Sequence, residues 1–273
     1  VLTKDFTGAE RSLKKAIELK PDFLPAQQRL IALYLRDKRE DAALGVVKTV
    51  QKQRVQAAIG FALEGDVRAA GQKWPEAVAA YRKAYQTTKS AELLVKLHAA
   101  LTRAGNSAEA DRLAEEWIRA QPQDVAVRAY LAERALAGNK PAEAVKYYEA
   151  ILKITPKNAL VLNNLAFAAG QLNDQRALSY AEEALKLAPA NPAILDTYGM
   201  LLVNKGEVEK GLAQLEKAKV GAPKAYAIRI NLAQAYIKAD RKPDAKRELQ
   251  SVVDEAADQA AVKARAEALL KTL

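Results

Sequence analysis

Residues 74–84 read WPEAVAAYRKA, and large and small side chains alternate along them at helical spacing. Trp74, Ala77, Tyr81 and Ala84 are three or four residues apart, so on an α-helix they share one face. A small residue such as Ala77 at the centre of that face lets a second helix approach closely. The stretch therefore predicts a helix that packs tightly against a neighbouring helix.

Ala77 is one member of a series of small residues, each 33 or 34 positions after the last. The series is Ala9, Ala43, Ala77, Ala110, Ala144, Ala177, Gly211 and Ala245. The residues seven positions further on are Ala16, Val50, Ala84, Trp117, Ile151, Ala184, Ala218 and Val252. Five units close with a proline, at Pro21, Pro122, Pro156, Pro189 and Pro223. Proline stops a helix, so this period indicates repeated helix hairpins.

The period predicts an all-α fold, a right-handed α-solenoid of antiparallel helix hairpins that forms a single array over residues 1–273. We expect half a repeat at 1–23, hairpins at 24–57, 58–90, 91–124, 125–158, 159–191, 192–225 and 226–257, and a capping helix at 258–273. The expected turns within hairpins include 104–106, 138–140, 204–206 and 239–241. Trp117 is expected to fill a buried slot between hairpins.

Both ends of the array carry their own expectations. On the capping helix, Ala261, Ala264, Ala268 and Leu269 are expected to cover the last hairpin. Lys263, Arg265, Glu267 and Lys271 are then expected to face water. Half a repeat at the start predicts an apolar exposed edge. Because the sequence opens on Val1, we expect it to be a piece of a longer chain.

The repeat resembles the tetratricopeptide (TPR) family. That family places a leucine and a small residue on the first helix, as in Leu131-Ala132 and Leu165-Ala166, and its aromatic and small positions on the second helix match 74–84. Residues 117–246 look most like the TPR lipoproteins of the bacterial PEP-CTERM/exosortase system, through phrases such as NNLAFAAGQ at 163–171. This resemblance implies a periplasmic protein, lipid-tethered through an upstream cysteine and working with exopolysaccharide machinery. The alternative location is the cytoplasm.

Composition argues against catalysis. The chain has no cysteine and a single histidine, His98, so a thiol nucleophile, a Cys/His pair and a histidine-rich metal site are absent from it. His98 follows Leu97, where a packed, hydrogen-bonded histidine is the simpler interpretation. We therefore predict no enzyme activity, no metal and no cofactor. A net charge of +10 raises nucleic acid or an anionic polysaccharide as a partner, but the cations alternate with acids along the repeats.

The predicted partner surface lies on the first helices of the C-terminal hairpins, where amide and apolar side chains recur. Its members are Tyr130, Glu133, Asn163, Asn164, Phe167, Asp196, Thr197, Met200, Asn204, Asn231, Gln234 and Lys238. An amide is both donor and acceptor and can pair with a peptide backbone of any sequence. Asn164 and Asn231 resemble the asparagine ladder with which some TPR proteins hold extended peptides. Simple solvated helix surface is the alternative interpretation of these positions.

The sequence therefore favours a scaffold that holds a partner protein or peptide in a groove. Two other functions stay open: a structural spacer that self-associates, and a solenoid that binds anionic polysaccharide or nucleic acid. Contact with a membrane is expected only through the upstream lipid.

Overall fold

The computed structural model describes residues 5–54, 57–256 and 258–273, and in these ranges it contains sixteen α-helices and no strand. The chain divides into two compact units after Val127, and each is described by itself. The predicted hairpin bounds remain a prediction. Their parts at 1–4, 55–56 and 257 lie outside the described residues.

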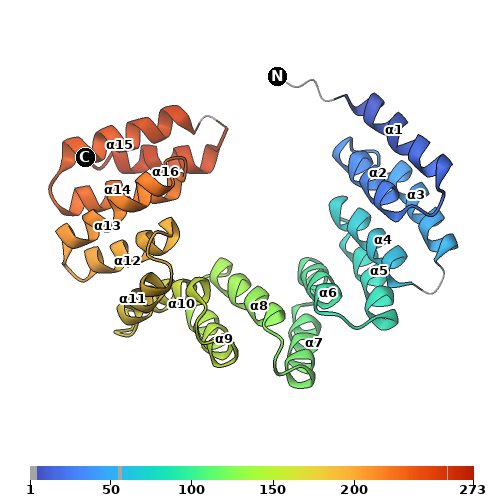
Figure 1. The fold of residues 1–273 in the computed structure, drawn as a ribbon, viewed down its shortest axis with the longest axis horizontal. Helices are drawn as coiled ribbons and strands as arrows, with labels where there is room; N and C mark the ends of the chain where they lie inside the picture. Colours follow the sequence, from blue (N-terminus) through green and yellow to red (C-terminus); the bar gives the residue numbers. More distant parts are fainter. Residues whose placement is uncertain (1–4, 55–56, 257) are drawn as a thin grey trace. The chain divides into compact units, whose positions relative to one another are not determined.

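Unit 1 is a series of helices in which each packs on the next along the chain (Figure 1). The helices are α1 (Phe6–Leu19), α2 (Leu24–Arg36), α3 (Glu40–Gln53), α4 (Ala58–Ala70), α5 (Trp74–Thr87), α6 (Ala91–Arg103) and α7 (Ser107–Ala120). Pro75 lies in the first turn of α5, where the missing N–H would have no helical partner.

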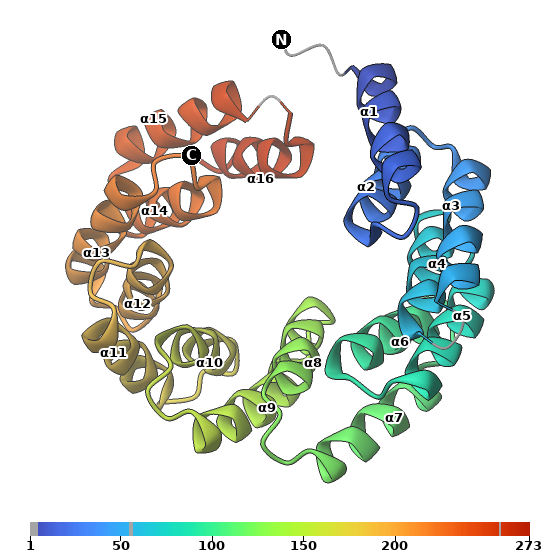
Figure 2. The same cartoon turned by 45° about the vertical axis from the view of Figure 1, so that its right-hand side comes forward.

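Unit 2 holds α9 (Pro141–Ile154), α10 (Ala159–Gln171), α11 (Ala177–Leu187), α12 (Pro192–Asn204), α13 (Val208–Gly221), α14 (Tyr226–Lys238), α15 (Lys242–Glu255) and α16 (Ala260–Leu270). The division between the units falls inside α8 (Ala126–Ala137). In unit 2, α10 packs on α12, α12 on α14, and α14 on α16. Figure 2 shows these four helices in one layer, here called the inner layer, with α11, α13 and α15 in the other.

The turn inside each hairpin repeats with the period of the sequence. One residue per turn has positive φ: Lys38, Gln72, Gly105, Asn139, Asn173, Gly206 and Asp240, which are 33 or 34 residues apart. In each turn the next N–H bonds the carbonyl five residues back, as Arg39 N does to Tyr34 O at 2.8 Å. This is the Schellman closure of a helix end. It accounts for the abrupt stop before each second helix.

The small anchors lie where helices approach most closely. The anchors from Ala43 to Ala245 are buried, whereas Ala9 is exposed. At Gly211 an added Cβ would lie 2.6 Å from the Gly199 carbonyl oxygen and 3.0 Å from the Val203 nitrogen. The backbones of α12 and α13 therefore touch, and only glycine fits there. The predicted fold class, an all-α stack of antiparallel helix hairpins, is confirmed.

Three local expectations were wrong. On α16 the buried side is formed by Ala266, with Val262, Leu269, Leu270 and Leu273 packed around it. Ala261, Ala264 and Ala268 are exposed, because the larger side chains remove more apolar surface from water when they face α14 and α15. Lys263 is half-buried, whereas Arg265, Glu267 and Lys271 are exposed as expected.

Among the described residues of α1 the exposed side is mixed, with Leu19 beside Arg11, Ser12 and Lys15, so the expected apolar edge is not seen there. Trp117 is only half-buried; its ring centroid lies 6.3 Å from that of Tyr85.

Candidate functional site

Four consecutive helices of the inner layer line one pocket of about 280 Å³. It is lined by Phe167, Gly170 and Gln171 of α10; Asp196, Thr197, Met200, Leu201 and Asn204 of α12; Asn231 and Gln234 of α14; and Arg265 of α16. Side chains three or four residues apart share a helix face, which brings each set to the same side. Gly170 keeps α10 close to α12, since a Cβ there would lie 2.6 Å from Leu201 Cδ2.

Seven predicted partner residues meet in this pocket: Phe167, Asp196, Thr197, Met200, Asn204, Asn231 and Gln234. Phe167 is 47% exposed, so an aromatic face is open to a ligand. In the described part of the chain, Gln234 makes no side-chain hydrogen bond, and neither does Gln171. Both amides can therefore donate to and accept from a bound segment.

Asp196 is the carboxylate of the pocket. It accepts two hydrogen bonds from Asn231 Nδ2, 2.9 Å and 3.1 Å from its two oxygens. Burial raises its pKa to about 6, and the Asn231 hydrogen bond and the charge of Arg265 offset only part of that rise. A carboxyl group with a raised pKa that lines a pocket is a common mark of a functional site.

Arg265 belongs to the pocket although we expected it to face water. Its Nη2 lies 3.4 Å from Asn231 Oδ1, and its side chain remains exposed. It follows Asn231 by 34 residues, as Asn231 follows Thr197. This repeat spacing was the signal that could have placed it, because α16 packs on α14 as a first helix does.

The remaining predicted residues lie outside the pocket. Lys238 Nζ donates to Asn204 Oδ1 at 2.9 Å. Asn163 is buried and donates to Asn164 Oδ1 at 3.3 Å. On α8, Tyr130 is half-buried and Glu133 is exposed.

Side chains of the proposed asparagine ladder already use hydrogen-bonding groups in contacts within the chain. Asn231 directs its donors at Asp196, and the Thr197 hydroxyl donates to the Ala193 carbonyl at 3.0 Å. The amides with open hydrogen-bonding groups are thus Gln234, one turn along from Asn231, and Gln171, two turns along from Asn164.

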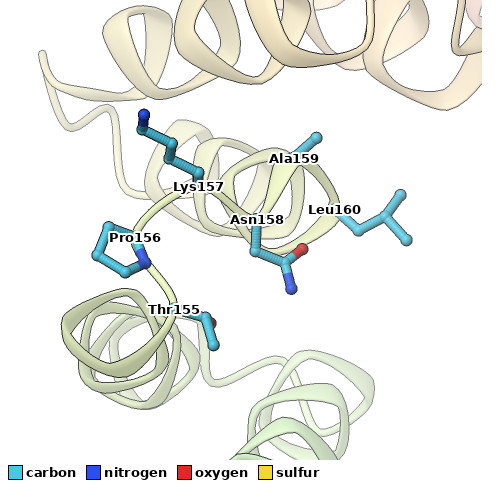
Figure 3. A pocket seen from close by; sticks show the side chains of 6 residues that line it. All are labelled: Thr155, Pro156, Lys157, Asn158, Ala159 and Leu160. Atoms are coloured by element: carbon cyan, nitrogen blue, oxygen red, sulfur yellow. The ribbon is translucent and has the colours of Figure 1, made fainter.

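A larger hollow of about 620 Å³ surrounds the turn between α9 and α10. Figure 3 shows its six side chains spreading outward from the turn instead of converging on one point. The Asn158 side chain caps α10 by accepting a hydrogen bond from Val161 N at 3.1 Å. Of the six lining residues, Lys157 alone is charged. This hollow offers little chemistry to a ligand.

His98 is 1% exposed, as expected for a packed histidine, with Nε2 3.6 Å from Asp111 Oδ1. None of the described helices has the length and apolar content needed to span a membrane.

Several basic side chains on the hairpins are paired with acids of a neighbouring repeat. Arg39 binds Glu10 at 2.6 Å, Arg82 binds Glu109 at 2.7 Å, and Arg176 binds Glu149 at 2.8 Å. At these positions an acid offsets the basic charge that would attract a polyanion.

Comparison with known proteins supports the fold. The model of the tetratricopeptide repeat-like domain matches residues 1–103. No curated protein sequence matches the chain closely enough to count as a relative. Among solved structures, the C-terminal part of a TPR repeat-containing protein from Cytophaga hutchinsonii has a TM-score of 0.59 at 16% identity, covering 84% of this chain and 95% of that one.

Two other solved structures are similar at low identity. Yeast Tom70 has a TM-score of 0.58 at 13% identity and covers 92% of this chain and 60% of its own. A chain of the Cut9–Hcn1 hetero-tetramer of the APC/C has a TM-score of 0.56 at 14% identity, covering 96% of this chain and 52% of that one. Likeness at this level shows the fold and says nothing of the partner.

Proposed function

We propose that this protein is a non-catalytic scaffold that holds a segment of a partner protein on the inner layer of unit 2. The observation that carries the proposal is the pocket built by α10, α12, α14 and α16. Helical repeat proteins bind along surfaces to which each repeat adds side chains. The pocket is built in that way, from four successive helices of the inner layer.

The chemistry of the pocket suits a peptide. Phe167 and Met200 provide apolar surface for a side chain of the partner. Gln171 and Gln234 provide donors and acceptors for its backbone. The volume of about 280 Å³ suits one or two side chains better than a cofactor.

For the biological setting we propose a bacterial exopolysaccharide or PEP-CTERM protein-sorting assembly, with the protein in the periplasm and tethered by a lipid on an upstream segment. This proposal rests on the likeness of residues 117–246 to the TPR lipoproteins of that system. The partner would then be a protein of the cell envelope.

The test is affinity capture from the envelope of the native host with three forms of the protein. The pocket variant carries Phe167→Ala and Gln234→Ala. The control carries Leu187→Ala on α11 and Gln250→Ala on α15, the layer that does not line the pocket. Leu187 is 42% exposed, which is close to the exposure of Phe167. We expect the pocket variant to lose a protein that the wild type and the control retain. Equal recovery of every protein by all three forms, with unchanged melting temperatures, would refute this site.

A further inference from the structure

Asp196 keeps its negative charge open to the pocket. Its carboxylate bonds Asn231, whose amide is neutral, and in the described part of the chain no Lys or Arg nitrogen lies within 4.0 Å of it. Arg265 lies beyond Asn231 and acts on Asp196 through space. Of the helices around it, α10 contributes no charged lining residue, α14 contributes Asn231 and Gln234, and α16 contributes Arg265.

Elsewhere the same chain shows what such a carboxylate binds. In unit 1, Lys96 Nζ lies 2.8 Å and 2.9 Å from the two oxygens of Asp66. Lys96 is the residue of α6 that corresponds by repeat spacing to Asn231 of α14 and Arg265 of α16. The fold thus seats a lysine ammonium on a carboxylate of the preceding repeat. In unit 2 the amide of Asn231 stands where α6 has Lys96. The carboxylate that it contacts, Asp196, lies one helical turn before Met200, the residue that corresponds by repeat spacing to Asp66.

The rest of the pocket complements a lysine side chain. Phe167 and Met200 offer apolar and aromatic surface to its methylene stem. The ring of Phe167, half open to solvent, can also attract an ammonium group over its face.

We propose that the pocket binds a lysine side chain of the partner segment, with its ammonium on the Asp196 carboxylate and its stem against Phe167 and Met200. This inference rests on the proposed function and names the chemistry of the segment. Arg265 is the competing cation, and its 3.4 Å contact with Asn231 is weak enough to be displaced.

Met200 makes a direct test available because it is the one methionine in the sequence. Protein labelled with ¹³C in the methionine methyl group reports on the pocket through that methyl signal. The probes are Nα-acetyl-lysine amide and, as a neutral match, Nα-acetyl-norleucine amide. Nα-acetyl-glutamate amide tests the opposite charge.

At pH 7.5 we expect the lysine probe to shift the Met200 signal saturably and to bind about tenfold or more tightly than the norleucine probe. Asp196→Asn should remove that preference, and Asp254→Asn, an exposed carboxylate on α15, should keep it. Arg265→Gln should tighten lysine binding about threefold by removing like-charge repulsion. Lysine binding should weaken as the pH falls through about 6, where Asp196 becomes protonated.

Equal binding of lysine and norleucine, or tighter binding of glutamate, would overturn the inference. If affinity capture still depends on Phe167 and Gln234 in that case, the scaffold proposal stands and only the lysine assignment fails. If neither probe binding nor affinity capture depends on the pocket residues, the scaffold proposal and the lysine assignment are both wrong.

Discussion

Each unit has a carboxylate on the first helix of a hairpin, Asp66 on α4 and Asp196 on α12, and the two are paired in opposite ways. In unit 1, Asp66 binds the Lys96 ammonium and accepts a hydrogen bond from the Tyr81 hydroxyl at 2.7 Å, so its charge is balanced within the fold. In unit 2, Asp196 binds only the amide of Asn231, and its pKa rises to about 6. The difference teaches that a carboxylate on the first helix of a hairpin can be closed in an ion pair or left available to a partner, according to the residue that the next first helix places beside it.

In unit 2 the buried carboxylate of Glu248 is paired with two cations. We expect its replacement to have the largest effect on the free energy of unfolding. Its side chain is 8% exposed and accepts from Arg229, which is 5% exposed, and from Lys219. Glu248→Ala would leave Arg229 buried with fewer partners, so we expect a loss of roughly 3–5 kcal/mol in the free energy of unfolding. Urea unfolding of the purified variant measures it. A loss under 1 kcal/mol would mean that this network does not hold α13, α14 and α15 together.

An ionised carboxylate that is partly buried without a paired cation lowers stability, so Asp196→Asn should stabilise the protein. The native pKa of Asp196, about 6, exceeds its ordinary value of 3.8. Its contribution to stability is therefore fully present below pH 3.8 and is lost as the pH rises through 6. Because Asp196 is partly solvated, we expect a gain of roughly 1–3 kcal/mol at pH 7.5.

Thermal unfolding of wild type and Asp196→Asn at several pH values checks this sign. The gap between the two should open between pH 4 and pH 6 and stay constant above that range. A variant less stable than wild type at pH 7.5 would show that Asp196 is closed by a partner after all.

Breaking the ion pair between Lys96 and Asp66 in unit 1 should change the free energy of unfolding by a smaller amount. Lys96→Met keeps most of the stem and removes the ammonium from Asp66, and both side chains are about one-third exposed, 29% and 33%. We expect a loss of roughly 1 kcal/mol, seen as a lower midpoint in urea. No change at all would mean that the pairing in unit 1 is incidental, and the contrast with Asp196 would lose its basis.

The smallest effect is expected at a surface pair. Glu109→Ala breaks the contact with Arg82, whose side chain is 43% exposed, and should change stability by less than about 0.5 kcal/mol. The same urea measurement applies. A change as large as that of Glu248→Ala would show that exposure does not rank these pairs.

Helix periodicity and turn chemistry are local properties, which explains what the sequence predicts well. The positions of Asn139, Gly206 and Asp240 in left-handed geometry follow from residues next to them in the chain. The small anchors likewise mark the close approach of neighbouring helices, as at Gly211. Seven pocket residues could be found in this way, because they recur on one face of successive first helices.

What the sequence left undetermined depends on packing between helices. The face of α16 was misjudged because its alanines are evenly spread, and the choice between faces is made by how Val262, Leu269 and Leu270 fit against α14 and α15. Arg265 was missed although its spacing of 34 residues from Asn231 could have placed it in the pocket. The hydrogen bond from Asn231 to Asp196 joins two residues that are 35 positions apart in the sequence. No local sequence pattern sets the rotamers of their side chains.

The most direct test of the open carboxylate is an NMR titration of the Asp196 side-chain carboxyl carbon in wild type and in Asn231→Lys. The variant places a lysine beside Asp196 at the position of α14 that corresponds by repeat spacing to Lys96 of α6. We predict a pKa of about 6 in wild type and a fall below the ordinary value of 3.8 in the variant, where an ammonium stabilises the ionised form. A wild-type pKa at or below 3.8, unchanged by Asn231→Lys, would contradict the account.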